Sequence, residues 1–339
     1  MPWKNEKDPY RIWLSEIILQ QTRVEQGRAY YERFIAAFPT VNDLARAPKK
    51  KIFKLWEGLG YYTRCRNLIH TAKKIAADFN GKFPSTYNQI ISLKGIGPYT
   101  AAAIASFAFN LPYPVVDGNV QRVIARYFGI AIPTTSSAEK IFYQGLAFAL
   151  LNKKSPAIYN QAIMDFGAVI CKPKSPLCDQ CPQSADCMAR KFGWENSLPV
   201  KKKKILKKER WFYYFLIQNG EQQIYVRERK ANDIWKNLYE FALCEKDSPL
   251  KESTSTFQKL AEEFLKVTSF QLKSLSEPFT QQLTHQTIHA RIINVEIRTA
   301  IPALKEYRAV SKKQIKSFPF PRLIANYLSN PIEHSFKIL

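Results

Sequence analysis

Four of the six cysteines in this chain lie within 17 positions, from Cys171 to Cys187, and are separated by six, two and five residues. Thiolates so close in sequence can converge on one metal centre, either an iron–sulfur cluster or a zinc ion. Disulfides are the alternative, but no signal peptide or long apolar segment points to an oxidising compartment. We therefore expect a metal centre on Cys171, Cys178, Cys181 and Cys187, and the spacing alone leaves iron–sulfur and zinc both open.

The charge of the chain indicates a polyanionic partner. Lys and Arg number 51 against 28 Asp and Glu, which gives a net charge of +23. Such an excess favours nucleic acid, because neutralising phosphates releases counterions. A basic protein without such a partner, or a ribosome-associated factor, is the alternative. No segment approaches the roughly 20 apolar residues that cross a bilayer, so we expect a cytoplasmic protein.

The pattern of apolar residues changes along the chain. Residues 1 to about 196 have helical spacing, first over a segment from Tyr10 to Phe38. Six lysines then stand among the eight residues 201–208, without an amphipathic pattern, and predict an exposed basic linker. Strand-like patterns follow, at Trp211 to Ile217, Gln223 to Val226 and Ile288 to Ile297, with a helical one at Thr256 to Phe264. The sequence thus predicts an all-α part followed by an α+β part.

A short glycine turn lies between two of the predicted helices. In the stretch Leu93-Lys94-Gly95-Ile96-Gly97-Pro98-Tyr99, Gly95 and Gly97 permit a tight turn with exposed backbone N–H groups. The helix that follows adds its own free N–H groups and the positive end of its dipole. This combination predicts a clamp for a phosphate, although most turns of this composition are only turns.

Several motifs together resemble a known family. The hairpin, the segment Asp117-Gly118-Asn119-Val120 and the cysteine spacing resemble the helix–hairpin–helix DNA glycosylases that carry a 4Fe–4S cluster. Within that family, Trp13-Leu14-Ser15-Glu16, Gln20-Gln21-Thr22 and Gly58-Leu59-Gly60-Tyr61-Tyr62 are similar to the MutY-like adenine glycosylases. The resemblance has clear motifs from Pro2 to about Leu198 and continues more weakly to the C-terminus.

The resemblance implies a multidomain fold and a cofactor. We expect an all-α helix–hairpin–helix core, an iron–sulfur domain and a C-terminal α+β Nudix-like (MutT-like) domain. The predicted boundaries are 1–112 for the hairpin domain, 113–196 for the domain of the cluster loop, 197–210 for the linker and 211–339 for the Nudix-like domain. The cofactor that the resemblance implies is a 4Fe–4S cluster on the four cysteines. The family also has a helix before Pro2-Trp3 that this sequence lacks, so we expect a less stable cluster domain.

Glu16 is the candidate proton donor. Glycoside cleavage needs an acid at the leaving group and negative charge near the sugar. Glu16 stands in the apolar run from Ile12 to Leu19, where a carboxyl group should have a raised pKa. A solvated glutamate on the outer face of a helix is the alternative. The family match favours the first interpretation, because it assigns Glu16 the protonation of the adenine ring.

Three more residues complete the predicted catalytic set. Asp117 could merely cap the helix that begins near Val120, whereas the resemblance makes it the carboxylate that stabilises the positive sugar. Asn119 corresponds to a residue that hydrogen-bonds within the same site. At Tyr99, related bifunctional enzymes have a lysine that forms a Schiff base and leads to strand cleavage. Because tyrosine forms no Schiff base, we expect a monofunctional glycosylase that leaves an abasic site.

Further residues are implied to contact DNA or the lesion. The C-terminal domain retains only Glu262 and Glu263 of the glutamates that a Nudix hydrolase needs, so we expect it to bind and not to hydrolyse nucleotides. Its recognition loop is Leu283-Thr284-His285, in which Leu283 replaces the family's aromatic residue. The residues assigned to DNA or lesion binding are Gln21, Thr22, Leu59, Tyr61, Gly95, Gly97, Gln161, Thr284 and His285.

The resemblance thus implies a monomeric glycosylase that removes adenine opposite 8-oxoguanine or guanine in double-stranded DNA at the bacterial nucleoid. Two alternatives stay open at this point. A thymine or uracil mismatch glycosylase of the same fold can also carry tyrosine after the hairpin. A non-enzymatic DNA-binding or redox protein with a cluster is the other, and the presence of both Glu16 and Asp117 argues against it.

Overall fold

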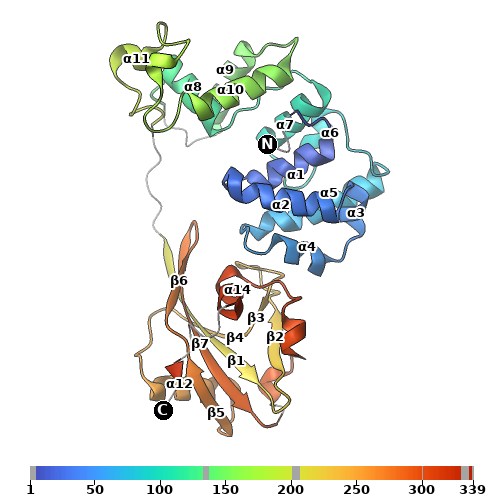
Figure 1. Cartoon of the computed structure of the whole chain (residues 1–339), viewed down its shortest axis with the longest axis vertical. Helices are drawn as coiled ribbons and strands as arrows, with labels where there is room; N and C mark the ends of the chain where they lie inside the picture. The colour runs from blue at the N-terminus through green and yellow to red at the C-terminus, as the bar shows by residue number, and fades with distance from the viewer. Residues whose placement is uncertain (1–4, 133–136, 201–206, 300, 330–335, 338–339) are drawn as a thin grey trace. The chain divides into compact units, whose positions relative to one another are not determined.

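The chain divides into two units. The computed structural model describes residues 5–132, 137–200, 207–299, 301–329 and 336–337. Unit 1 comprises Met1–Ala47 and Thr63–Lys204, and unit 2 comprises Pro48–Tyr62 and Ile205–Leu339. Among the described residues, unit 1 contains only helices, whereas unit 2 combines a sheet with helices (Figure 1). The predicted boundary at 112/113 stays a prediction, and residues 201–206 of the predicted linker lie outside the described residues.

The helical part predicted from the sequence is found in unit 1. Pro9 stands at the N-terminus of its first helix and Pro98 and Pro156 begin two others, where a missing N–H group costs nothing. The helices are α1 (Pro9–Leu19), α2 (Val24–Ala37), α3 (Val41–Arg46), α5 (Tyr62–Asp78), α6 (Tyr87–Ile91), α7 (Pro98–Phe109), α8 (Gly118–Tyr127), α9 (Ser137–Leu150), α10 (Pro156–Val169), the 3₁₀ helix η1 (Cys178–Gln180) and α11 (Met188–Phe192).

The first helical segment is interrupted, contrary to the continuous pattern in the sequence. Helix α1 ends at Leu19, and Gln21 has a left-handed φ of 58° before α2 begins. Arg64 of α5 donates hydrogen bonds to the carbonyl groups of Ile17, Ile18 and Gln20, at 2.8, 2.9 and 2.6 Å. The guanidinium thus satisfies carbonyl groups at the end of α1 that have no partner within the helix. Apolar periodicity could not predict this break, because the stabilising residue comes from a distant helix.

Helix α7 lies at the centre of unit 1. Its residues Ala101–Ala105 are all completely buried. Small side chains allow close approach, and α7 packs against α1 and α10, while α10 also packs against α8. These three packed contacts bring residues from α1, α7, α8 and α10 to one place.

Unit 2 contains a mixed sheet. Within the described residues the strand order is β3-β2-β1-β7-β5-β9, with β4 beside β1, β6 beside β7 and β8 beside β2. Strands β1 and β7 are parallel from Lys208 opposite Gln286 to Gln218 opposite Glu296, and all other pairs are antiparallel. The elements are α4 (Lys49–Trp56), β1 (Lys208–Gln218), β2 (Ile224–Glu228), β3 (Tyr239–Glu240), β4 (Ala242–Lys246), α12 (Thr254–Leu265), β5 (Phe270–Leu275), β6 (Phe279–Gln282), β7 (Gln286–Ile297), the 3₁₀ helix η2 (Pro302–Leu304), β8 (Arg308–Val310), α13 (Lys312–Ile315), α14 (Arg322–Ser329) and β9 (Phe336–Lys337).

Helices cover both faces of the sheet. Phe257 of α12 packs with Phe215 and Ile293 in the largest cluster of unit 2. On the opposite face, the Tyr327 hydroxyl of α14 lies 3.0 Å from the Asn294 amide nitrogen. The strands and the helix that the sequence predicts in this part are confirmed, and so is the α+β class.

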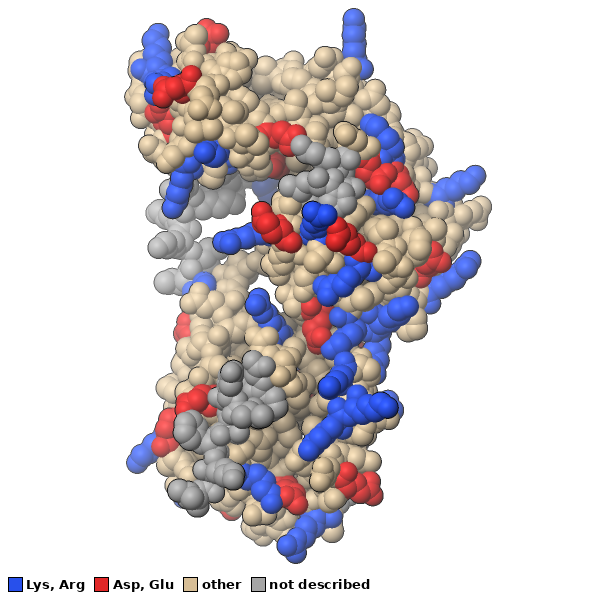
Figure 2. Space-filling model, viewed as in Figure 1, with Lys and Arg blue, Asp and Glu red and all other residues tan. Residues whose placement is uncertain are grey.

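The structure also shows where basic side chains gather and whether any described helix could cross a membrane. On the face shown in Figure 2, Lys and Arg side chains gather over α4 and the neighbouring part of unit 2. None of the helices in the described ranges combines the length and the apolar character that crossing a bilayer requires.

Candidate active site

One cavity in unit 1 brings the predicted catalytic residues together. It has a volume of about 730 Å³ and is bounded by α1, α7, the start of α8, and α10. The predicted residues that line it are Glu16, Thr22, Tyr99, Asp117, Asn119 and Gln161. These positions are up to 145 residues apart in the sequence, and the packing of α7 against α1 and α10 is what joins them.

Glu16 has the environment that the sequence predicted. Its neighbours Trp13, Leu14 and Ile17 on α1 are buried in the core, while Glu16 itself lines the cavity. Burial raises the pKa of the carboxyl group to about 7, a hydrogen bond with Tyr99 opposes this rise, and the charge on Asp117 adds to it. At neutral pH a large fraction of Glu16 is therefore protonated.

Tyr99 is the hydrogen-bond donor to Glu16. It lies in the first turn of α7, directly after the glycine hairpin. Burial raises the pKa of the phenol well above 10, and the charges on Glu16 and Asp117 act in the same direction. The phenol thus keeps its proton at any physiological pH and donates a hydrogen bond to the carboxyl group.

Asp117 both caps a helix and lines the cavity. One of its carboxylate oxygens accepts a hydrogen bond of 2.8 Å from the Val120 backbone N–H, which caps α8. The other accepts a hydrogen bond of 2.8 Å from the Asn119 side-chain amide. Burial raises the pKa of Asp117, but these donors and the positive Arg122 oppose the rise. Asp117 accepts hydrogen bonds from more donors than Glu16, which has the one from Tyr99, and these donors support its ionised form.

Arg122 connects this carboxylate to the cysteine loop. Its Nη2 donates to the Asn119 side-chain oxygen at 2.9 Å and to the Gly167 carbonyl at 2.7 Å. Its Nε donates to the Cys171 carbonyl at 2.8 Å. One guanidinium on α8 therefore holds the amide that contacts Asp117 and the backbone of the first cysteine. Arg122 was not predicted from the sequence, although its spacing of three from Asn119 places both on one side of α8.

Gln161 is held in one orientation by another residue that was not predicted. Its amide nitrogen donates to the Asp165 carboxylate at 3.0 Å, and both residues line the cavity. A carboxylate only accepts hydrogen bonds, so it selects the NH₂ end of the amide. Gln161 and Asp165 are four positions apart on α10, the spacing at which helical side chains meet.

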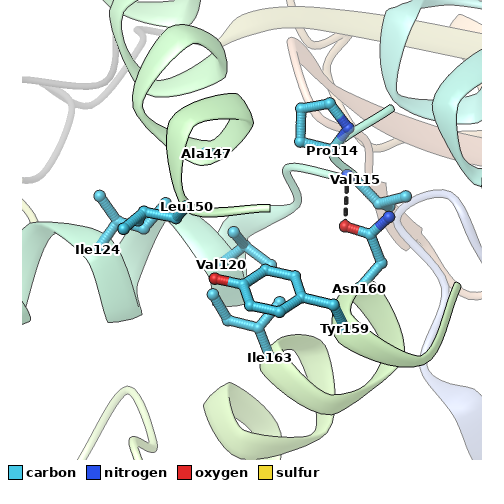
Figure 3. Close-up of a pocket in the computed structure, with 9 residues that line it drawn as sticks. All are labelled: Pro114, Val115, Val120, Ile124, Ala147, Leu150, Tyr159, Asn160 and Ile163. Carbon is cyan, nitrogen blue, oxygen red and sulfur yellow. Dashed lines mark hydrogen bonds between the residues drawn. The ribbon is translucent and has the colours of Figure 1, made fainter. Parts of the chain in front are cut away.

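Asn160 fixes the segment that leads to Asp117. Its side-chain oxygen accepts from the Val115 backbone N–H at 3.0 Å, as the dashed line in Figure 3 shows. Its amide nitrogen donates to Ser106 Oγ of α7 and to the Tyr113 carbonyl, both at 2.9 Å. Asn160 is 1% exposed, and all these partners are within unit 1. It lies beside a small apolar cavity of unit 1 that Val120 and Ile163 line.

The predicted hairpin is a tight turn at Gly95, and its role as a phosphate clamp stays a prediction. Gly95 has a φ of 82°, and a Cβ atom there would lie 2.5 Å from Asn67 Cβ, so both backbone shape and space favour glycine. Thr71 Oγ1 donates to the Lys94 carbonyl at 2.8 Å and fixes the turn on α5. Gly97 precedes α7, and a Cβ atom at Gly97 would meet open space among the described residues.

Comparison with known proteins identifies the family of this chain. Residues 14–147 match the HhH-GPD superfamily base excision DNA repair proteins, and residues 213–330 match the NUDIX domain. The adenine DNA glycosylase of Buchnera aphidicola subsp. Schizaphis graminum is 40% identical over 245 residues, which are 71% of this chain and 69% of that protein. The chain belongs to the adenine DNA glycosylase family. It is an enzyme of base excision repair, as the resemblance in its motifs implied.

Two other relatives cover less of the chain. The adenine DNA glycosylase of Homo sapiens is 40% identical over 199 residues, which are 56% of this chain and 36% of that protein. A solved structure of a thermostable thymine-DNA glycosylase is 32% identical with a TM-score of 0.53, and covers 57% of this chain and 88% of that protein. The helical architecture is therefore shared with a glycosylase named for another base.

The four cysteines of this adenine glycosylase line one cavity beside Arg126. None of them forms a disulfide, and Arg126 donates to the Cys171 sulfur at 3.3 Å. Within the described ranges, no three His, Cys, Asp or Glu side chains are arranged to hold a single metal ion. In a 4Fe–4S cluster each cysteine binds a different iron, so the sulfurs need not approach one ion. The lining by free thiols fits the cluster that the family resemblance implies.

Some of the predicted lesion-binding residues lie in unit 1 and others in unit 2. Thr22 and Gln161 line the unit 1 cavity, whereas Gln21 is exposed and does not. In unit 2, the Tyr61 hydroxyl lies 2.5 Å from the Thr284 hydroxyl, and Thr284 and His285 are exposed in the loop between β6 and β7. This contact was not foreseen from the sequence.

Leu59 differs from its neighbour Tyr61 in exposure. Leu59 is 6% exposed, whereas Tyr61 is 46% exposed and has a left-handed φ of 47°. Of these two residues, Tyr61 has the side chain available to a ligand in this conformation.

Proposed function

We propose that this adenine DNA glycosylase removes adenine paired with 8-oxoguanine or guanine by hydrolysis and leaves an abasic site. The observation that carries this proposal is the cavity shared by Glu16, with a pKa of about 7, and Asp117, held by hydrogen bonds. A volume of about 730 Å³ admits a nucleoside that has been flipped out of the duplex.

The chemistry divides between the two carboxyl groups. Protonated Glu16 donates its proton to a ring nitrogen of the purine, so that adenine leaves as a neutral base. The electron pair of the glycosidic bond goes to the base, and C1′ becomes an oxocarbenium-like cation. The ionised Asp117 stabilises that cation by its charge. Glu16, now ionised, takes a proton from water as the water oxygen bonds to C1′.

Tyr99 makes the proposed reaction monofunctional. Its phenol cannot form a Schiff base with the sugar, so the reaction ends at the abasic site. The hydrogen bond from Tyr99 holds the Glu16 carboxyl group in place and opposes the rise of its pKa.

Gln161 supplies recognition of the base. Asp165 accepts from one N–H of the Gln161 amide and so fixes which end of the amide is the carbonyl oxygen, which can accept a hydrogen bond from a ligand. A carbonyl oxygen accepts a hydrogen bond from the exocyclic amine of adenine and offers nothing to the 6-oxo group of hypoxanthine.

In this proposal, residues of unit 2 recognise the base opposite the adenine. Tyr61 and Thr284, whose hydroxyl groups are in contact, combine an exposed aromatic ring with a small polar group. His285 adds a donor beside them. An aromatic face stacks on bases and the polar groups distinguish the oxidised guanine. Leu283 provides no aromatic ring, so we expect lower preference for 8-oxoguanine over guanine than an aromatic residue would give.

A 4Fe–4S cluster on Cys171, Cys178, Cys181 and Cys187 is part of the proposal. When bound, it holds the loop that carries Lys172 and Lys174 in a fixed shape for DNA contact. Broad absorption near about 400 nm and roughly four irons per chain are the expected signs. A colourless protein with one zinc ion would contradict this part.

One assay tests the proposed activity. The purified monomeric protein is incubated with duplexes that contain adenine opposite 8-oxoguanine, thymine opposite guanine, or uracil opposite guanine, and abasic sites are then cleaved with alkali. We expect strand breaks only after alkali and only in the first duplex. Breaks in the thymine or uracil duplexes alone would support the mismatch glycosylase instead, and breaks without alkali would contradict the monofunctional mechanism.

A further inference from the structure

Unit 2 has a basic face outside the lesion-binding loop. It is formed by α4 and by the segment from β8 to the residues after α13, and Figure 2 shows basic side chains gathered there. We call it the α4–α13 face. Its cations are Lys49, Lys50, Lys51, Lys54, Arg308, Lys312, Lys313 and Lys316, and the acidic residues in the same segments are Glu57 and Glu306.

An aromatic ring holds two of these cations near each other. The Lys50 ammonium lies 3.3 Å from the centre of the Phe318 ring and donates to Ser317 Oγ at 3.0 Å. The Arg308 guanidinium lies 5.9 Å from the centre of the same ring. Each contact is a cation–π attraction, but together they keep two like charges at one ring. The cost of that repulsion falls when an anion binds between or beside them.

The acidic residues nearby do not neutralise the face. Glu57 pairs with Lys54 at 2.5 Å and also accepts the Phe320 backbone N–H at 2.8 Å. In the described parts of the chain, Lys50, Arg308 and the lysines at α13 have no carboxylate within ion-pair distance. Burial lowers the pKa of Lys50, and the positive Arg308 and Lys54 lower it further, which agrees with an excess of positive charge.

Helix α4 buries one of its sides and so holds its part of this face in place. Its residues Ile52, Phe53 and Trp56 are buried, which leaves the lysines on its other side toward solvent. Lys54 also donates to the Phe318 carbonyl at 3.1 Å and joins α4 to the segment after α13. The charges are therefore fixed to two packed elements and not to a free tail.

We propose that the α4–α13 face binds the sugar–phosphate backbone of duplex DNA, independently of base sequence. Seven of its eight cations are lysines, which contact phosphate as point charges and do not need a particular base edge. DNA is already the ligand of this family, and backbone binding by a surface without catalytic residues goes beyond the proposed function.

The test compares two triple variants with equal loss of charge. Lys312→Gln, Lys313→Gln and Lys316→Gln remove charge from the proposed face. Lys251→Gln, Lys259→Gln and Lys266→Gln remove the same charge from the region of α12 and serve as the control. Affinity for a lesion-free duplex of about 30 base pairs is measured across a salt series, with thermal unfolding to show that both variants are folded.

The expected result is a smaller salt dependence for the first variant only. Each lost phosphate contact reduces the slope of log K against log[salt] by about 0.9, so we expect a decrease of roughly 2 to 3. The control should change the slope by less than about 0.5. Equal slopes for the two variants would overturn the proposal. Adenine excision by the wild type at saturating protein is measured separately. Absence of excision would contradict the proposed function, whereas the salt slopes test DNA binding by the α4–α13 face.

Discussion

The phenol of Tyr99 donates a hydrogen bond to the Glu16 carboxyl group, within a cavity that Asp117 also lines. The bond is favourable to the ionised carboxylate and therefore opposes the effect of burial. The pKa of Glu16 is thus the result of two opposed contributions, which variants can separate.

Removing the Tyr99 hydroxyl should move the pH dependence of the reaction. In Tyr99→Phe the carboxyl group loses a donor, so its pKa rises above about 7. The alkaline limb of the single-turnover rate, which reports loss of the Glu16 proton, should shift to higher pH. Excision of adenine measured from pH 5 to 9 checks this, and a limb that stays in place or moves to lower pH contradicts the assigned hydrogen bond.

Glu16→Gln should remove a pH-dependent loss of stability. Folding raises the pKa of this acid from 4.5 to about 7, so its proton stabilises the fold fully below pH 4.5. That stabilisation is lost as the pH rises through about 7, by up to roughly 3 kcal/mol. Glutamine has no proton to lose. We expect the melting temperatures of the two proteins to diverge from pH 5 to 8, with the variant becoming relatively more stable, and parallel curves would argue against a buried acid.

Arg122→Lys should weaken the link between the site and the cysteine loop. Lysine cannot reproduce the three planar contacts with Asn119, Gly167 and Cys171. Each lost bond to the charged group costs about 1.5–3 kcal/mol, so we expect a lower melting temperature and a lower iron content together with slower excision. Arg46→Lys, at an exposed helix end, is the control. Unchanged iron content and rate would contradict the link.

The fold was predictable wherever local patterns decide it. The Asp117 cap follows from residue type and position, and the alternation in Ile288 to Ile297 gives the central strand β7. The break after Leu19 was missed because Arg64, 45 positions away, stabilises it. The site shows the same difference between features set by local patterns and features set by residues distant in the sequence.

The resemblance placed Glu16 and Asp117 in one catalytic set, whereas local patterns say nothing of how they meet: packing of α7 against α1 and α10 joins them in one cavity. Asp165 and Arg122 belong to no recognisable sequence motif. Their hydrogen bonds to Gln161 and Asn119 in the structure show that they are part of the site. Tyr61 and Thr284 are 223 positions apart, so local patterns say nothing of their contact.

Asp165→Asn should relax the choice of base. An asparagine also presents a donor, so it no longer selects the NH₂ end of the Gln161 amide. The amide can then rotate and offer its nitrogen to an oxygen on the base. We expect the ratio of adenine to hypoxanthine excision opposite 8-oxoguanine to fall by about 5- to 30-fold, which corresponds to roughly 1–2 kcal/mol. An unchanged ratio with a reduced overall rate would mean that Asp165 has only a structural role.

The role of Glu16 as the proton donor is tested most directly by a single-turnover experiment with Glu16→Gln on a duplex containing adenine opposite 8-oxoguanine. We predict that the variant binds this duplex within a few-fold of the wild type, while adenine release slows by about 10²- to 10⁴-fold, the range for loss of a general acid. Release of adenine at the wild-type rate by a variant with no acid at position 16 would contradict this role.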